Sequence, residues 1–521
     1  MEPGIGNPGD VLHIHGENFG HEKNEFSFIT IAGAPPTASS YISWDDNLIR
    51  VKFPEFFNGG LVYVHRRDRR SNPVLFTRMA VIPQPVHGEH NEGGPVITSI
   101  EPLSGAVGSL ITIHGNNFGH SIDVTTVEEA AGQEAPVMPG VWFSSAPADA
   151  PSPNMVPVFE TDFGYDFWSE REIRVRIPDG AVSGNLIVRT PKDSSRPVFF
   201  EVTGKPGAKT FKDKRTYNFS YSAGIKAVEA QLPNSLYLWM PIPASSSSQR
   251  NISVIDRSME PVFENFRGAS LYQLTDMLPG AGKSVNLSFS ADVYAVETNV
   301  SAVNIRQDMN SPVQKNYTLP SQLIPSDNPQ LAAQAAAVTG REQNPYLKAG
   351  LIYNWLIKEI DFKAPVPADT EALKALEEKK ADNYSAVLLF CAMARARGVP
   401  AIPVAGFLIS PEISAALHYW AEFWVDGFGW VPLDPALGAG AAPQGFNLKQ
   451  DHAAFYFGNM DNQRIAFSRG ETTFSPMDMK GMALGRRRSF AFQNVWEEAT
   501  GGLVSYSSLW SDITIMGMYI Q

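Results

Sequence analysis

Apolar and polar residues alternate over much of the first 320 positions, in short runs separated by turns rich in glycine and proline. In one run Ile49, Val51 and Phe53 alternate with Arg50 and Lys52, which is the period of a strand with one buried face. The 42 glycines and 39 prolines of the chain suit many tight turns. The pattern therefore predicts an N-terminal part made of β-strands.

An internal repeat divides the beginning of the chain into two similar units. Residues 9–21 (GDVLHIHGENFGH) recur 99 positions later as 108–120 (GSLITIHGNNFGH). A second match, residues 44–54 against 168–178, has an offset of 124 positions. The second copy therefore carries about 25 extra residues, and we expect them around 133–153 in a surface loop.

In each copy a strand runs into Gly-x-Asn-Phe-Gly, and this pattern resembles the immunoglobulin-like IPT/TIG domains. We expect one such sandwich at residues 1–86 and another at 95–203. The resemblance implies modules that are mostly extracellular or on a surface and that bind protein or glycan. The first strand of the second copy, 95–99, has its counterpart before Met1, so we expect a targeting segment upstream of this chain and an extracytoplasmic location, in the periplasm or at the cell surface.

Strand-like alternation continues from 209 to 319 and predicts a third β domain. After Pro325 the period becomes that of amphipathic helices. Two Asn-Pro pairs, at 328–329 and 344–345, predict helix starts, because asparagine caps a helix and proline suits its first turn. A further helix is predicted over 383–397, with Asp382 as its cap and Gly398 as its stop.

Three segments of this region resemble the transglutaminase-like superfamily, which has a papain-type α+β fold. They are Arg395-Ala396-Arg397-Gly398-Val399-Pro400-Ala401, His418-Tyr419-Trp420-Ala421-Glu422 and Gly429-Trp430-Val431-Pro432-Leu433-Asp434-Pro435. The resemblance covers about residues 320–480 and implies that His418 is the catalytic base and Asp434 its orienting partner. The family keeps a nucleophilic cysteine at the start of the preceding helix, and in this chain that position is Asn383.

The turn Asp426-Gly427-Phe428-Gly429 predicts a hairpin centred on Gly427. This register places His418 and Asp434 on one face of the sheet, within reach of each other. Residues expected to line the cleft as binding residues are Trp420, Glu422, Trp430 and Tyr384.

An asparagine amide does not ionise near neutral pH, so Asn383 cannot act as the nucleophile. Cys391 is eight residues further on, about 12 Å along the helix axis, in an apolar run that predicts a buried position. Ser385 is rotated by about 200° from Asn383. The sequence therefore predicts a degenerate triad and a catalytically inactive protein that binds or scaffolds through its Ig-like domains and its cleft.

Two other interpretations stay open. One is an active acyltransferase or cysteine-protease-type amide hydrolase in which Asn383 is an inactivating substitution or another residue attacks. The other is a glycan-binding cell-surface protein whose sandwich domains do the work. The expected partner is a protein or a cell-envelope glycan, and no cofactor is predicted. Four histidines recur with the repeat, at 15, 21, 114 and 120, but no cysteine or carboxylate cluster accompanies them, so no metal site is predicted.

Composition and charge argue against several classes of protein and structural feature. The net charge of −12 disfavours binding of nucleic acid by the whole molecule. The single cysteine excludes an intrachain disulfide, and no apolar run is long enough for a membrane span. Two basic runs, 65–70 and 486–488, are expected to be solvated loops. Residues 481–521 are expected to form a β extension that packs on the core.

Overall fold

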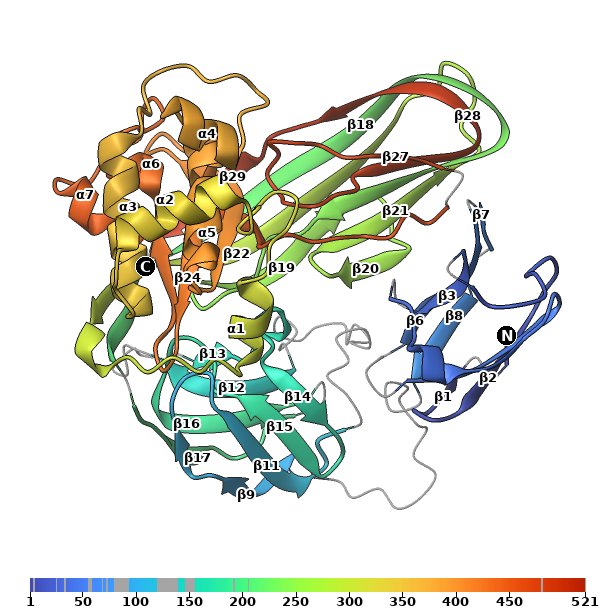
Figure 1. Ribbon diagram of the computed structural model, residues 1–521, viewed down its shortest axis with the longest axis horizontal. Helices are drawn as coiled ribbons and strands as arrows, with labels where there is room; N and C mark the ends of the chain where they lie inside the picture. The colour runs from blue at the N-terminus through green and yellow to red at the C-terminus, as the bar shows by residue number, and fades with distance from the viewer. Residues whose placement is uncertain are drawn as a thin grey trace.

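The structure is a computed structural model that describes residues 1–2, 5–24, 26–31, 34–54, 59–67, 69–71, 74–78, 93–119, 139–145, 155–190, 193–204, 206–478 and 481–520. Figure 1 shows four parts: two sandwiches at the right and bottom, a large sheet at the upper right and a helical cluster at the upper left. The expected multidomain fold, all-β followed by α+β, is confirmed.

The first sandwich has β2, β5 and β4 in one sheet and β1, β8, β6 and β3 in the other, with β7 paired to β6. On β5, Ile49 and Val51 are buried while Arg50 and Lys52 are exposed, as the alternation predicts. The strands are β1 (Ile5–Gly6), β2 (Val11–His15), β3 (Ser27–Ile31), β4 (Tyr41–Trp44), β5 (Leu48–Lys52), β6 (Gly59–Arg66), β7 (Arg69–Arg70) and β8 (Val74–Arg78).

The second sandwich repeats this arrangement, with β14, β15, β11 and β9 in one sheet and β10, β17, β16, β12 and β13 in the other. Its strands are β9 (Val96–Glu101), β10 (Ser104–Gly105), β11 (Leu110–Asn116), β12 (Gly140–Ser145), β13 (Met155–Pro157), β14 (Tyr165–Trp168), β15 (Glu172–Arg176), β16 (Ala181–Arg189) and β17 (Val198–Val202). Within the expected insertion, 133–153, residues 139–145 are described, and β12 there is a buried strand rather than a loop because Val141 and Phe143 fill the sandwich core. The other residues of that stretch lie outside the described ranges.

The middle sheet is built around β18 (Gly207–Pro241), which pairs with β22 (Lys283–Val300) over its first half and with β21 (Ala269–Thr275) over its second. β19 (Gln249–Arg257) and β20 (Phe263–Phe266) extend the sheet on its two sides. The C-terminal strands belong to the middle sheet, and their buried Trp510 and Ile515 share a cluster with residues of the C-terminal core such as Phe407. β28 (Glu497–Trp510) and β29 (Thr514–Ile520) form ladders with β18, and β27 (Met482–Leu484) pairs with β28, so they complete the middle sheet.

The C-terminal core is a sheet in the order β25, β24, β23, β26 with helices packed on one face. The sheet strands are β23 (Ala401–Ile409), β24 (Ala415–Val425), β25 (Gly429–Leu433) and β26 (Arg464–Arg469). The helices are α1 (Pro312–Tyr317), α2 (Pro329–Thr339), α3 (Pro345–Glu359), α4 (Ala372–Glu378), α5 (Asn383–Ala396), α6 (Pro435–Gly438) and α7 (His452–Phe455). Figure 1 shows α5 lying against β24.

Helix α5 is buried from Tyr384 to Arg395, as its unbroken apolar run predicts. It packs on the sheet face formed by Phe423, Val425, Val431 and Leu433. The opposite sheet face is turned towards the second sandwich and the middle sheet. The candidate site therefore lies in a sheet that is covered on both sides.

Candidate active site

The start of α5 is fixed by a capping box at the helix N-terminus. Asp382 Oδ1 accepts hydrogen bonds from the backbone N–H of Ser385 (2.9 Å) and from the Ser385 hydroxyl (2.6 Å). Asn383 is consequently the first residue of the helix, where free N–H groups and the helix dipole favour negative charge. This is the position at which a thiolate would be stabilised.

The β24–β25 hairpin positions the side chains of His418 and Asp434. Its ladder pairs Ala421 with Leu433 and Val425 with Gly429, so it is centred on Gly427 as the turn predicts. The register brings His418 Nε2 to 2.7 Å from Asp434 Oδ2. Both side chains are almost completely buried, with 1% and 0% of their surface exposed.

The third member of the constellation is Asn383. Its amide nitrogen donates to His418 Nδ1 at 2.8 Å. Nδ1 is then the acceptor of a neutral imidazole, and Nε2 carries the proton that is donated to Asp434. The three predicted residues therefore meet, and an amide occupies the place where a nucleophile would face the imidazole.

Arg464, for which no motif predicted a role, joins this site. Its Nη1 lies 3.3 Å from Asp434 Oδ2, and its Nη2 lies 2.7 Å from Asp461 Oδ2. Burial raises the pKa of Asp434, but His418, Arg464 and the Leu437 backbone N–H outweigh burial and hold that pKa below its usual value. The short spacing between Asp461 and Arg464 could have indicated their ion pair. Nothing in the sequence indicates that Arg464 also contacts Asp434.

The other nucleophile candidates do not face the imidazole. Cys391 is completely buried, and burial raises the pKa of its thiol to about 12. Ser385 is buried, and its hydroxyl donates to the cap residue Asp382. Tyr384, expected to be a binding residue, is 3% exposed and packs edge-on against Tyr419.

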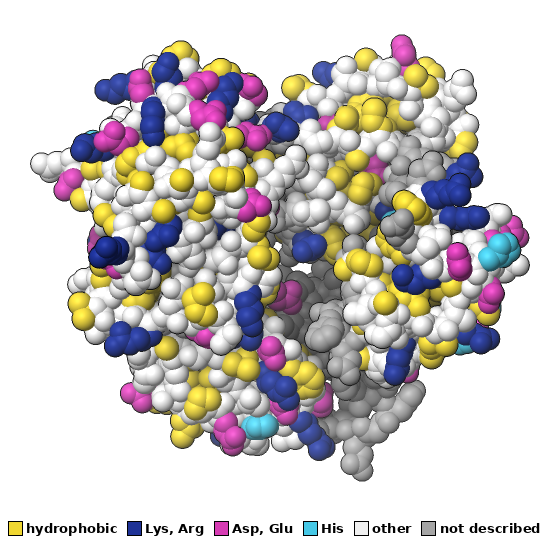
Figure 2. Space-filling view, viewed as in Figure 1, with side chains coloured by type: hydrophobic (Ala, Val, Ile, Leu, Met, Phe, Trp, Pro, Cys, Tyr) yellow, Lys and Arg dark blue, Asp and Glu magenta, His cyan; other side chains and the backbone are white. Residues whose placement is uncertain are grey.

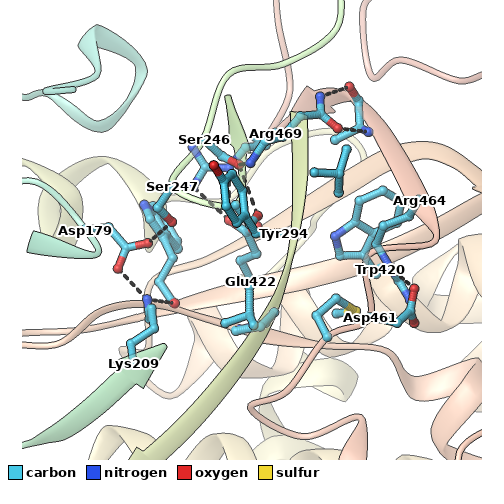
Figure 3. A pocket seen from close by; sticks show the side chains of 18 residues that line it. Asp179, Lys209, Ser246, Ser247, Tyr294, Trp420, Glu422, Asp461, Arg464 and Arg469 are labelled. Carbon is cyan, nitrogen blue, oxygen red and sulfur yellow. Dashed lines mark hydrogen bonds and ion pairs between the residues drawn. The ribbon is translucent and has the colours of Figure 1, made fainter. Parts of the chain in front are cut away.

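The expected cleft residues Trp420, Glu422 and Trp430 are also buried, at 4%, 9% and 2% exposure. They line a cavity between the sheet, the second sandwich and the middle sheet (Figure 3). The space open to the centre of a water molecule is about 30 Å³, enough for one or two ordered waters. In this structure these side chains form a junction between domains rather than an open cleft.

Charged groups surround that cavity. Lys209 of β18 pairs with Asp179 of the second sandwich and donates to the Trp430 carbonyl at 2.5 Å. The same Asp179 accepts from the Ser247 hydroxyl at 2.5 Å. Figure 3 shows Asp179 between these two partners. A Cβ at Gly429 would collide with the Asp179 carboxylate, so glycine there permits the close approach of β25 and the sandwich.

A second ion-pair group lies beside the cavity. Arg469 Nη2 is 2.7 Å from Glu422 Oε2, and Nη1 is 2.9 Å from Asp162 Oδ1, which belongs to the second sandwich. Burial raises the pKa of both carboxyl groups, and the nearby Arg469 only partly offsets this effect. The second sandwich is therefore attached to the core through buried charge.

The two basic runs fit the expected solvated loops only in part: the first is a hairpin with Arg66, Arg67 and Arg69 exposed, and the second is a loop whose arginines form ion pairs. Arg66, Arg69 and Arg70 belong to the β6–β7 hairpin, and Figure 2 shows basic side chains gathered on that part of the surface. Each arginine of 486–488 has an acidic partner. Arg486 pairs with Glu497, Arg487 with Glu371 and Arg488 with Asp382. Arg488 also lies over the Tyr384 ring, so this segment crosses the start of α5.

The described residues hold no group of three or more His, Cys, Asp or Glu side chains placed to bind a metal ion. Of the repeated histidines, His15 and His21 are exposed, His114 is half-buried, and His120 lies outside the described residues. Among the described helices, none has the length and apolar character needed to cross a membrane.

Comparison with known families agrees with the geometry. The profile of the transglutaminase-like superfamily matches residues 332–435, from α2 to the residue after Asp434. The profile of the IPT/TIG domain matches residues 95–133, at the start of the second sandwich. An uncharacterized protein of Haemophilus influenzae is 24% identical over 242 residues, which is 38% of this chain and 63% of that protein. The chain thus spans less than two thirds of that relative's length.

Two solved structures are similar in part. A protein from Cytophaga hutchinsonii, provisionally named a cysteine protease, is 14% identical with a TM-score of 0.37, and the match covers 60% of this chain and 93% of that one. The periplasmic domain of TgpA from Pseudomonas aeruginosa is 14% identical with a TM-score of 0.25, covering 46% and 92%. On the two family profiles, residues 332–435 belong to the transglutaminase-like superfamily, in a chain that also carries an IPT/TIG domain.

Proposed function

We propose that the transglutaminase-like core is catalytically inactive and that the protein is an extracytoplasmic binding or scaffold protein. The observation that carries this proposal is the hydrogen bond between the Asn383 amide and His418 Nδ1. Papain-type acyl transfer needs an ionisable group at that place, and an amide supplies neither a thiolate nor a transferable proton of suitable pKa. The extracytoplasmic location rests on the resemblance of the domains to surface and periplasmic modules.

The alternative is an active acyltransferase or amide hydrolase. It requires a nucleophile facing His418 Nδ1. Cys391 is buried eight residues along α5 with a raised pKa, and the Ser385 hydroxyl is committed to Asp382. The His418–Asp434 pair has a structural use without any reaction, because it satisfies two buried polar groups and ties β24 to the start of α6.

The proposal is tested by placing a cysteine at position 383, where the family keeps its nucleophile. We expect the wild-type protein to show no amine incorporation and no amide hydrolysis, and Cys391 to resist iodoacetamide. In Asn383→Cys, the helix start and His418 should lower the thiol pKa from the ordinary value of about 8.5 to 7.5 or less. At pH 6.5 alkylation should then be at least about tenfold faster than that of a control thiol in Asn310→Cys, an exposed position in the turn before α1.

The double variant Asn383→Cys with His418→Ala should lose most of that acceleration, because the imidazole no longer pairs with the thiolate. Turnover by the wild-type protein that disappears in His418→Ala would contradict the proposal. Equal alkylation rates at positions 383 and 310 would show that the preserved histidine and helix start do not form a site competent for thiol chemistry.

A further inference from the structure

On the outward face of the middle sheet, the paired strands β18 and β22 carry no charged residue over three consecutive outward pairs. β18 and β22 pair there without a bulge, and alternate pairs of the ladder, such as Phe219 with Phe289, are buried inside. Alternation therefore points the intervening pairs outward, where they are exposed or half-buried. The outward pairs are Asn218 with Ser290, Ser220 with Ser288, and Ser222 with Asn286. We call these six residues the neutral face.

The absence of charge is limited to β18 and β22, because on the neighbouring β19 the exposed Asp256 lies opposite Ser288. The same two strands carry the Lys212–Glu297 ion pair further along the ladder, and Lys214 pairs with Asp292 just beyond Asn218. Asp292 itself is 8% exposed, and the Asn251 amide also donates to its carboxylate at 2.9 Å. Exposed sheet faces ordinarily carry mixed charges for solubility, so an uncharged stretch in a chain of net charge −12 is unusual.

Large exposed side chains flank the neutral face on β28 and β29. Tyr519 lies opposite Thr216 and is 63% exposed, and Leu509 lies opposite Gly224 and is 66% exposed. Between them, Gly517 stands opposite Asn218, and a glycine has no side chain to obstruct the surface. From Thr216 to Gly224 the surface runs about 27 Å, at about 3.4 Å per residue.

In the sequence, the neutral face and the neighbouring strand appear as three Asn-x-Ser motifs. Asn218-Phe219-Ser220 and Asn286-Leu287-Ser288 lie on the two central strands, and Asn251-Ile252-Ser253 lies on the neighbouring β19. In a strand, residues i and i+2 share a face, so on β18 and β22 each match places an amide and a hydroxyl together on the outside. The pattern thus reflects a surface composition rather than three separate motifs.

We propose that the neutral face binds an uncharged polysaccharide lying along the strands. Serine hydroxyls and asparagine amides both donate and accept hydrogen bonds, which matches a ligand whose own groups are hydroxyls. An anionic ligand such as a nucleic acid or an acidic glycan would need lysine or arginine at these rungs. Tyr519 supplies an aromatic surface with an apolar face and a polar tip, suited to the apolar face of a sugar ring.

This assignment rests on the proposed binding function and names its surface and ligand class. The test is affinity electrophoresis of the whole chain in gels cast with dextran, mannan or hydroxyethyl cellulose, and with alginate as the acidic comparison. We expect retardation by at least one neutral polysaccharide. Asn218→Asp with Asn286→Asp, which keeps side-chain shape and adds two charges, should weaken that binding at least tenfold, as should Tyr519→Ala.

The matched control is Asn47→Asp with Asn310→Asp, two exposed asparagines outside the middle sheet, which should bind as the wild type does. Thermal melting should be the same for all variants because the substituted side chains are exposed. Retardation by alginate alone, by no polysaccharide, or equally by the wild type and the Asn218/Asn286 variant would overturn the proposal. Those outcomes leave the inactive-core proposal standing, since iodoacetamide kinetics and turnover test it separately.

Discussion

The two sandwiches share a repeated sequence and a strand order, yet they are attached to the molecule in different ways. The core of the first sandwich consists of its own residues, such as Ile49, Val51 and Phe53. The core of the second sandwich is continuous with the C-terminal core, because Ile402, Trp424 and Trp430 belong to the same buried cluster.

A few residues at one end of the sandwich account for the difference. In the second copy, η3 (Glu160–Asp162) supplies Asp162 to Arg469, and the turn after β15 supplies Asp179 to Lys209. The corresponding helical turn of the first copy, η1 (Ala38–Ser40), carries no acidic residue. The first sandwich instead meets the rest through Arg70 and Tyr63, which donate to the carbonyls of Pro476 and Met477. One fold thus serves as a fused structural part in one copy and as a tethered module in the other.

The largest expected effect tests the fused core. Trp430→Ala removes a 2%-exposed ring that packs edge-on against Trp424 and should cost about 3–5 kcal/mol. We expect calorimetry to show the second sandwich and the C-terminal core losing stability together. Phe53→Ala should lower only a separate transition of the first sandwich. If Trp430→Ala left the second sandwich melting at its original temperature, the two cores would not be continuous.

Next is the buried ion pair at the junction. Lys209→Met leaves Asp179 buried without its cation and should cost about 3 kcal/mol in urea denaturation. Adding Asp179→Asn to this variant should recover much of the loss, because the uncompensated charge is removed. A double variant as unstable as the single one would mean that packing, and not charge, dominates the junction.

A smaller effect depends on pH. Glu422 and Asp162 have pKa values raised by burial, so the folded protein holds their protons more tightly than the unfolded chain does. Their contribution to stability therefore decreases as pH rises through the raised pKa values and is largest below the ordinary values near 4.5 and 3.8.

Glu422→Gln should remove part of this dependence. The difference in unfolding free energy between wild type and variant should then move in favour of the wild type as pH falls from 7 to 5, by up to about 1.4 kcal/mol for each unit of raised pKa. A difference that moves the other way would mean that pairing with Arg469 outweighs burial. The transition of the first sandwich serves as an internal reference.

The smallest expected effect is at Arg70, which attaches the first sandwich to the rest of the chain. Arg70→Ala removes one hydrogen bond to a carbonyl and a stacking contact with Tyr63, and should cost under about 1 kcal/mol. We expect limited proteolysis to release the first sandwich sooner while the Tm of the remainder stays unchanged. A large loss of stability in the remainder would show that the first sandwich is also an integral part of the core.

The sequence was most informative where local rules apply. The cap at Asp382 and the turn at Gly427 each follow from neighbouring residues, so the approach of His418 to Asp434 could be anticipated from one hairpin. The place of Asn383 beside His418 was implied by the resemblance to the transglutaminase-like superfamily.

The contacts that were missed join residues distant in sequence. Arg469 and Asp162 are 307 positions apart, and neither a period nor a motif links them. For the same reason Trp420, Glu422 and Trp430 were expected in an open cleft, although the second sandwich and the middle sheet cover them. The arginines of 486–488 were expected to be solvated because their acidic partners, such as Glu371 and Asp382, lie on other elements.

The pairing of β29 with β18 also has a consequence for biosynthesis. Arg215 to Ser220 lie about 300 residues before the strand that completes their ladder. While the ribosome makes those residues, Tyr217 and Phe219 lack part of their final cover, and this side of the sheet remains an open edge. Pairings this distant in sequence form slowly, so the nascent chain passes through a long period in which chaperone binding to that edge would favour correct folding over aggregation.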